Sequence, residues 1–136
     1  MNELNPFEQE VVNVLDEIKE LFIRKNAGYN GNGNPLLNFQ TGARLLYGSD
    51  GFVGCFEALK AYTAKHVSNV YTHTIQAPNL EESMKDIATY MIIGTVMKRM
   101  FDMTQQEEMR ASESEPESVS EEPKQESEEP IIEENA

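Results

Sequence analysis

The chain of 136 residues is long enough for one domain, and its charge is distributed very unevenly. Residues 105–136 contain twelve acidic and two basic residues, a net charge of −10, whereas residues 1–104 contain twelve acidic and nine basic residues, a net charge of −3. The nearly neutral first part has no basic, aromatic-rich stripe, so we expect no nucleic-acid partner. It also has no apolar run that approaches the roughly twenty residues of a membrane span and no signal-peptide pattern at its start, so we expect no membrane partner. A single cysteine, Cys55, fits the reducing environment of a cytoplasmic protein.

The first predicted element is a long amphipathic helix. Asn5-Pro6 is typical of an N-cap followed by proline at the first helical position, and Glu8 is placed to complete a capping box. Apolar residues then recur at helical spacing, so we expect the helix to reach about Lys25. The Gly- and Asn-rich segment 26–35 should end it as a loop.

Two further helices follow this loop. A short apolar run predicts a helix over residues 36–47, ended by Gly48. A longer run predicts a third helix over residues 52–71. The segment 75–78, which ends in proline, prevents this helix from continuing.

The last predicted helix begins after Asn79, with Glu82 in the capping-box position. Strand-like alternation does not occur over a useful length, so the pattern predicts an all-α bundle of three long helices and one short helix in residues 1–104. So small a bundle could require a homodimer to bury its apolar stripes. Residues 105–136 are rich in Ser, Glu and Pro and should form a disordered acidic tail.

Two pairs of carboxylates are candidates for a metal site. Glu17 and Glu20 lie three residues apart on the first predicted helix, and Glu82 and Asp86 lie four apart on the last. If these helices pack side by side, the four side chains could converge at one rim and hold Mg²⁺, which prefers oxygen ligands. The alternative is that all four are ordinary solvated residues and that Glu82 only completes a helix cap.

Cations and bare backbone amides accompany these carboxylates. Arg24 and Lys25 close the first helix, and the Gly/Asn-rich loop that follows can wrap a small polar ligand. Lys65 and His66 on the third helix could contact phosphate oxygens. Alternatively, Arg24 and Lys25 only complement the helix dipole, and Lys65 and His66 are surface residues.

The order of these motifs resembles a known family. The series is Lys25, Gly28-Tyr29, Asn38-Phe39, Lys65-His66, and 82–86 leading into Ala88-Thr89-Tyr90. It resembles small phage and prophage proteins of the nucleotide-modification-associated class, which look like relatives of the all-α, MazG-like nucleoside triphosphate pyrophosphohydrolases. The resemblance covers about residues 8–100.

The resemblance implies a helical bundle, often dimeric, that binds a (deoxy)nucleotide with Mg²⁺ and hydrolyses it between the α and β phosphates. It implies Glu17, Glu20, Glu82 and Asp86 as the catalytic and metal-binding residues, Lys25 and Lys65 as phosphate contacts, and Tyr29, Asn34 and Asn38 as residues near the base or sugar.

The expected function is therefore that of a Mg²⁺-dependent pyrophosphohydrolase in phage nucleotide metabolism, and two alternatives stay open. The pair Glu82 and Asp86 is spaced one residue longer than the Glu-x-x-Asp of the hydrolases, so the chain could instead bind or sequester a nucleotide without turnover. It could also be an interaction module that acts through residues 105–136, in which Ile131-Ile132 is an isolated aliphatic pair.

Overall fold

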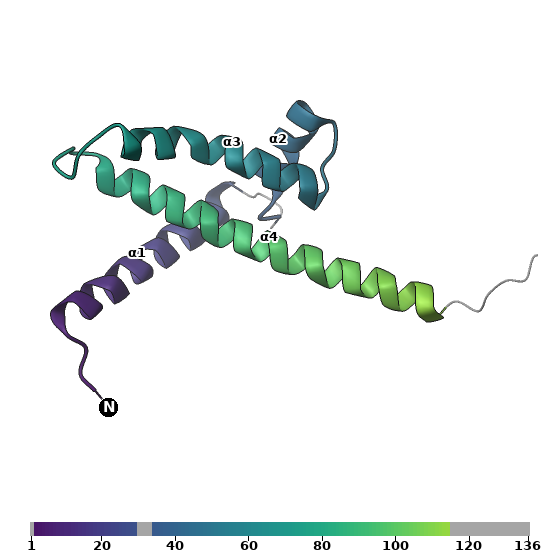
Figure 1. Cartoon of the computed structure of the whole chain (residues 1–136), viewed down its shortest axis with the longest axis horizontal. Helices are drawn as coiled ribbons and strands as arrows, with labels where there is room; N and C mark the ends of the chain where they lie inside the picture. The colour runs from purple at the N-terminus through teal and green to yellow at the C-terminus, as the bar shows by residue number, and fades with distance from the viewer. Residues whose placement is uncertain (1, 30–33, 115–136) are drawn as a thin grey trace, which may run out of the picture.

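Four α-helices make up the part of the chain that the computed structural model describes, which is residues 2–29 and 34–114, without the side chains of residues 27–29. No strand occurs within these ranges, so the predicted all-α class with one short and three long helices is confirmed. The helices are α1 (Pro6–Tyr29), α2 (Leu37–Tyr47), α3 (Phe52–Tyr71) and α4 (Leu80–Ser114) (Figure 1).

Helix α1 begins with the predicted capping box. The Asn5 amide donates to Glu8 Oε2 at 2.9 Å, and the Glu8 amide donates to Asn5 Oδ1 at 2.8 Å. This exchange satisfies two amides that the first helical turn leaves without partners. The helix continues to Tyr29, four residues beyond its expected end at Lys25, because no proline interrupts these positions and a glycine near a helix end costs only about 1 kcal/mol.

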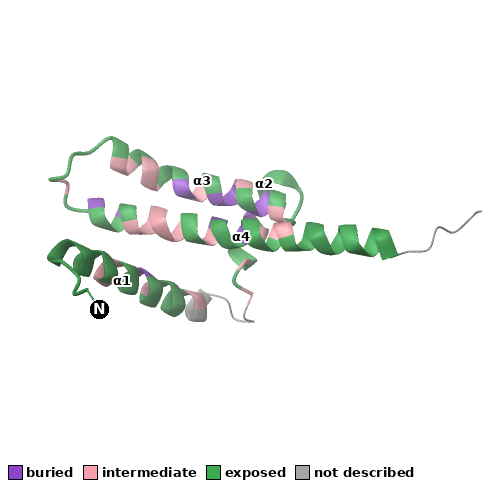
Figure 2. Cartoon of the chain, turned by 60° about the horizontal axis from the view of Figure 1, so that its bottom comes forward, coloured by how far each residue is buried: buried purple, intermediate pink, exposed green. Residues whose placement is uncertain are grey.

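Helices α3 and α4 form an antiparallel hairpin, and α2 packs against α3. Near the turn of the hairpin, Asn69 Nδ2 donates to Ser83 Oγ at 2.7 Å, which joins the two long helices through a nearly buried pair of side chains. Apart from Ile18 on α1, the buried residues lie mostly where α3 faces α4 and α2 (Figure 2). The central cluster consists of Phe39, Ala43, Cys55, Leu59 and Met97.

Helix α1 contributes little to this core. It rests mainly on α4, and among the large apolar side chains described between Pro6 and Asn26, Ile18 alone is buried. Phe7 and Leu15 are 78% and 54% exposed, and Val11 and Phe22 on the same side of the helix are also exposed. A contiguous apolar stripe of this kind is typical of an interaction surface, so the homodimer expected from the sequence stays a prediction with α1 as its contact face.

Helix α4 extends well beyond the predicted domain boundary. It runs through Ser114, so residues 105–114 are helical, whereas the composition placed the start of the tail at Gln105. These ten positions contain three glutamates and one arginine, and because Gln, Glu, Met, Arg and Ala are good helix formers, local propensity continues the helix. Residues 115–136 lie outside the described part of the chain. Of the helices described, none combines the length and apolarity that a bilayer span requires.

The close approach of α3 to the α2–α3 turn makes Gly54 intolerant of a side chain. A Cβ at Gly54 would lie 2.7 Å from the carbonyl oxygen of Ser49 and 3.2 Å from Ala43 Cβ. Because the first of these atoms belongs to the backbone, we expect Gly54→Ala to lower the free energy of unfolding by about 1–3 kcal/mol in urea denaturation.

Gly51→Ala is the matched control in the same turn. Gly51 has a φ of −70°, and its Cβ would meet nothing nearer than Ser49 Oγ at 3.8 Å. Alanine lowers the conformational entropy of the unfolded chain, which stabilises the fold, but it is a poorer N-cap than glycine, which destabilises the helix. Because these effects oppose each other, we expect the free energy of unfolding to change by no more than about 0.5 kcal/mol. Equal losses of unfolding free energy in Gly54→Ala and Gly51→Ala would contradict the predicted clash at Gly54.

The exposed stripe on α1 predicts self-association. We expect light scattering after gel filtration to give about twice the 15.4 kDa mass of the chain, and the double variant Phe7→Ser, Leu15→Ser to shift the mass toward one chain. Leu45→Ser is the control, because Leu45 is 81% exposed on α2, away from the stripe. A wild-type protein that elutes as a single chain at all concentrations would rule out this interface.

Candidate functional site

Two adjoining pockets lie between α1, the start of α2 and the first half of α4. The first, which we call the mixed pocket, has a volume of about 520 Å³. The second, the charged pocket, has a volume of about 440 Å³. Leu21, Lys25 and Asp86 line both, so the two volumes meet at a cation and a carboxylate.

The mixed pocket combines aromatic and polar walls. Phe22 from α1 and Tyr90 from α4 contribute aromatic rings, while Asn38 from the first turn of α2 contributes an exposed amide. The ring of Tyr90 also lies edge-on to Phe39, at a centroid separation of 6.3 Å. Since Phe39 belongs to the central core, the pocket wall is anchored directly to the most tightly packed part of the molecule.

Asp86 is held in place by a histidine from the neighbouring helix. His66 Nδ1 on α3 lies 3.4 Å from Asp86 Oδ2, and both side chains are largely shielded from solvent. The imidazole also lies beside the ring of Tyr90, at a centroid separation of 5.9 Å. Burial raises the pKa of the Tyr90 phenol, and the negative charge of Asp86 raises it further.

The charged pocket lies beside an ion pair that joins α1 to α4. Lys85 Nζ donates to Glu17 Oε2 at 2.6 Å and lies 3.3 Å from Glu81 Oε1 on its own helix. The hydrogen bond to Glu17 raises the pKa of the Lys85 ammonium, and the second bond to Glu81 adds to the effect. Lys85 therefore already has two carboxylate partners.

Several of the residues expected from the sequence come together here. Lys25 and Asp86 line both pockets, Asn38 lines the mixed pocket, and Glu82 lines the charged pocket. His66 reaches the same place through its contact with Asp86. Segments far apart in the sequence thus meet around Lys25 and Asp86.

Other expected residues lie elsewhere. Glu20 and Lys65 are exposed on α1 and α3, outside both linings. Asn34 has a local role, because its Oδ1 accepts the Leu36 amide at 3.0 Å and its Nδ2 donates to Gln40 Oε1 at 2.8 Å. The side chain of Tyr29 lies outside the described residues.

The four candidate carboxylates do not gather into one cluster. Glu17 bonds to Lys85, Glu20 lines neither pocket, and only Glu82 and Asp86 share a lining. Within residues 2–29 and 34–114, no three acidic, histidine or cysteine side chains are grouped closely enough to hold a metal ion. Two carboxylates nevertheless fit the mode in which Mg²⁺ keeps several waters and takes its remaining ligands from substrate phosphates.

Tyr90 and Lys85 are the site residues that the sequence pattern did not single out. Tyr90 closes the motif series that carries the family resemblance but was not predicted to bind a ligand, although it follows Asp86 by four residues and so shares its face of the helix. Lys85 follows Glu81 by the same spacing, which could have indicated the ion pair on α4. Its bond to Glu17 depends on how α1 crosses α4, for which the sequence contains no local signal.

Comparisons of this chain with protein-family models, with curated proteins and with solved structures give no match. The geometry of the two pockets is therefore the basis of the functional argument.

The environment of Tyr90 predicts a measurable alkaline titration. We expect the difference in tyrosinate absorbance between the wild type and Tyr90→Phe to show a phenol that ionises above pH 10.0, its ordinary value. Asp86→Asn should move this ionisation to lower pH, because it removes a nearby negative charge. A difference curve centred at or below pH 10.0 would contradict the burial of this phenol.

The same shift predicts the sign of a pH effect on stability. An unfolded chain releases the Tyr90 proton near pH 10.0, whereas the folded chain retains it to higher pH. The folded state then binds more protons than the unfolded state, so stability falls as the pH rises from about 10 through the folded pKa. In urea denaturation, Tyr90→Phe should lose less stability than the wild type over this alkaline range.

Proposed function

We propose that the protein binds a nucleotide across the two joined pockets. One observation carries the proposal: an aromatic and polar pocket meets a charged pocket at Lys25 and Asp86. A nucleotide has the same division, with an aromatic base and a sugar at one end and phosphates at the other. Both volumes fall within the range of about 300–1,000 Å³ typical of ligand pockets.

The mixed pocket suits the base and sugar. The rings of Tyr90 and Phe22 offer apolar faces for a heterocycle, and aromatic stacking of this kind tolerates any base. The amide of Asn38 supplies both a donor and an acceptor that could pair with a base edge or a hydroxyl.

The charged pocket suits phosphates that arrive together with a divalent cation. Lys25 can pair with a phosphate, but Lys85 is already engaged by Glu17 and Glu81. Since acidic side chains outnumber the lysines of this pocket, bare phosphates would be repelled, whereas a Mg²⁺–phosphate complex would not. Glu82 and Asp86 are the residues that would hold the ion, which would neutralise phosphate charge.

Hydrolysis of the nucleotide is the second candidate function. Glu82 and Asp86 lie beside Lys25 in one pocket, which is a chemically reasonable setting for a metal-assisted pyrophosphohydrolase. The resemblance of the motifs to MazG-like and phage proteins favours the same chemistry, in a cytoplasmic role in phage nucleotide metabolism. Binding without turnover requires fewer of these residues to act together, and we take it as the leading function.

Affinity measurements on site variants test the proposal. We expect nucleotides to raise the melting temperature of the wild type in the presence of Mg²⁺, because a ligand at about 100 times its dissociation constant adds about 2.7 kcal/mol. In calorimetric titrations, Lys25→Ala and Asp86→Asn should each weaken binding by about 10- to 150-fold, since contacts to charged groups contribute about 1.5–3 kcal/mol. Lys60→Ala is the control, because Lys60 is exposed and pairs with Glu57 outside both pockets.

Chromatography of the incubated nucleotides separates the two candidate functions. Release of pyrophosphate and a monophosphate would establish the hydrolase, whereas recovery of the intact nucleotide would leave the binding protein. The absence of a shift with every nucleotide, with and without Mg²⁺, would overturn both.

A further inference from the structure

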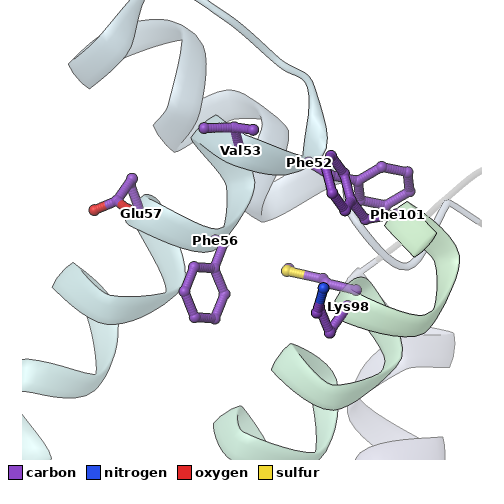
Figure 3. A pocket seen from close by; sticks show the side chains of 7 residues that line it. Phe52, Val53, Phe56, Glu57, Lys98 and Phe101 are labelled. Carbon is purple, nitrogen blue, oxygen red and sulfur yellow. The ribbon is translucent and has the colours of Figure 1, made fainter. Parts of the chain in front are cut away.

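A separate apolar pocket lies between the start of α3 and the middle of α4. Its volume is about 270 Å³, and rings from both helices converge on it (Figure 3). None of its residues lines the mixed or the charged pocket. Its lining consists of Phe52, Val53, Phe56, Met97 and Phe101, with Glu57 and Lys98 at the rim.

This pocket, which we call the phenylalanine pocket, has exposed apolar walls and a buried base. Met97 at its base is 2% exposed, but Phe56 and Val53 on its walls are 44% and 70% exposed. The volume lies just below the range of about 300–1,000 Å³ of drug-sized ligands, and the walls offer almost no hydrogen-bonding groups. Aliphatic side chains of a peptide segment therefore fit it better than a polar metabolite does.

A cation lies on each wall of the phenylalanine pocket. Lys60 Nζ on α3 is 5.5 Å from the centre of the Phe56 ring, and Lys98 Nζ on α4 is 5.7 Å from the centre of the Phe101 ring. Glu57 and Asp102 pair with these lysines, at 2.8 and 2.7 Å, but both cations stay largely exposed. The pocket is thus an apolar floor flanked by two ion pairs, whose lysines stay exposed enough to donate to a further carboxylate.

The sequence of this chain contains a segment in which an aliphatic pair lies between acidic residues. Ile131-Ile132 follows Glu128-Glu129-Pro130 and precedes Glu133-Glu134. We propose that residues 128–134 dock in the phenylalanine pocket of their own chain, with the isoleucine pair on the apolar floor and the flanking glutamates beside Lys60 and Lys98.

The connecting chain is long enough for this contact. From Phe101 to the end of α4 at Ser114 the helix rises about 20 Å, at 1.5 Å per residue. Residues 115–130 can span up to about 50–60 Å, so the isoleucine pair can return to the pocket. Because a tether raises the effective concentration of the segment at the pocket, the same chain is the favoured source of the occupant.

Methyl NMR of the full-length chain tests the docking. With ¹³C-labelled isoleucine δ1 methyls, assigned through Ile131→Val and Ile132→Val, we expect ring-current shifts upfield and NOEs to phenylalanine ring protons. Val53→Asp should abolish both signals, because it puts a negative charge into the pocket; since Val53 is 70% exposed, the change removes little packing. Ile75→Asp is the matched control: Ile75 is 91% exposed in the turn between α3 and α4, outside the pocket.

A second variant tests the electrostatic part of the contact. Lys98→Glu should reduce the NOE intensities and move the two methyl signals toward their random-coil positions, with unchanged far-UV circular dichroism. Random-coil methyl signals in the wild type that do not change in Val53→Asp would overturn the proposal. NOEs found only between differently labelled chains in a mixed sample would also overturn it, because the occupant would then come from a second copy.

Discussion

The attachment of α1 to α4 is the contact on which both pockets depend. It rests on the burial of Ile18 and on the bond between Glu17 and Lys85. Burying an isoleucine side chain contributes about 1.5–3 kcal/mol, whereas an ion pair with an exposed partner contributes little. Ile18 therefore supplies most of the stability of this contact, and the ion pair mainly determines where along α4 the helix rests.

This weak attachment has a consequence for ligand binding. A helix with one buried apolar side chain opens more readily than the α2–α3–α4 core. A ligand that contacts Lys25 on α1 and Tyr90 on α4 binds only the closed arrangement, so it would stabilise the position of α1. The rigid half of the site is α4, because Tyr90 packs on Phe39 of the core.

The sequence predicted the elements well and their mutual placement poorly. Helical spacing and the Asn5–Glu8 capping box are local signals, and both are confirmed. The end of α4 was wrong because composition was given more weight than helix propensity after Thr104. For the carboxylates, local spacing shows which side chains share a face of one helix, but the crossing of α1 over α4 decides that Glu17 meets Lys85 instead of Asp86.

Helix α4 connects the two binding regions of the molecule through one core. Its first half carries Asp86 and Tyr90, and its middle carries Met97, which belongs both to the central cluster and to the floor of the phenylalanine pocket. Leu59 of α3 lies in the same cluster and is fully buried, so displacing Met97 would disturb the packing that also supports Phe39 and Tyr90. Since interiors are close-packed, the floor of the phenylalanine pocket and the Tyr90 wall of the mixed pocket rest on the packing of the same few side chains.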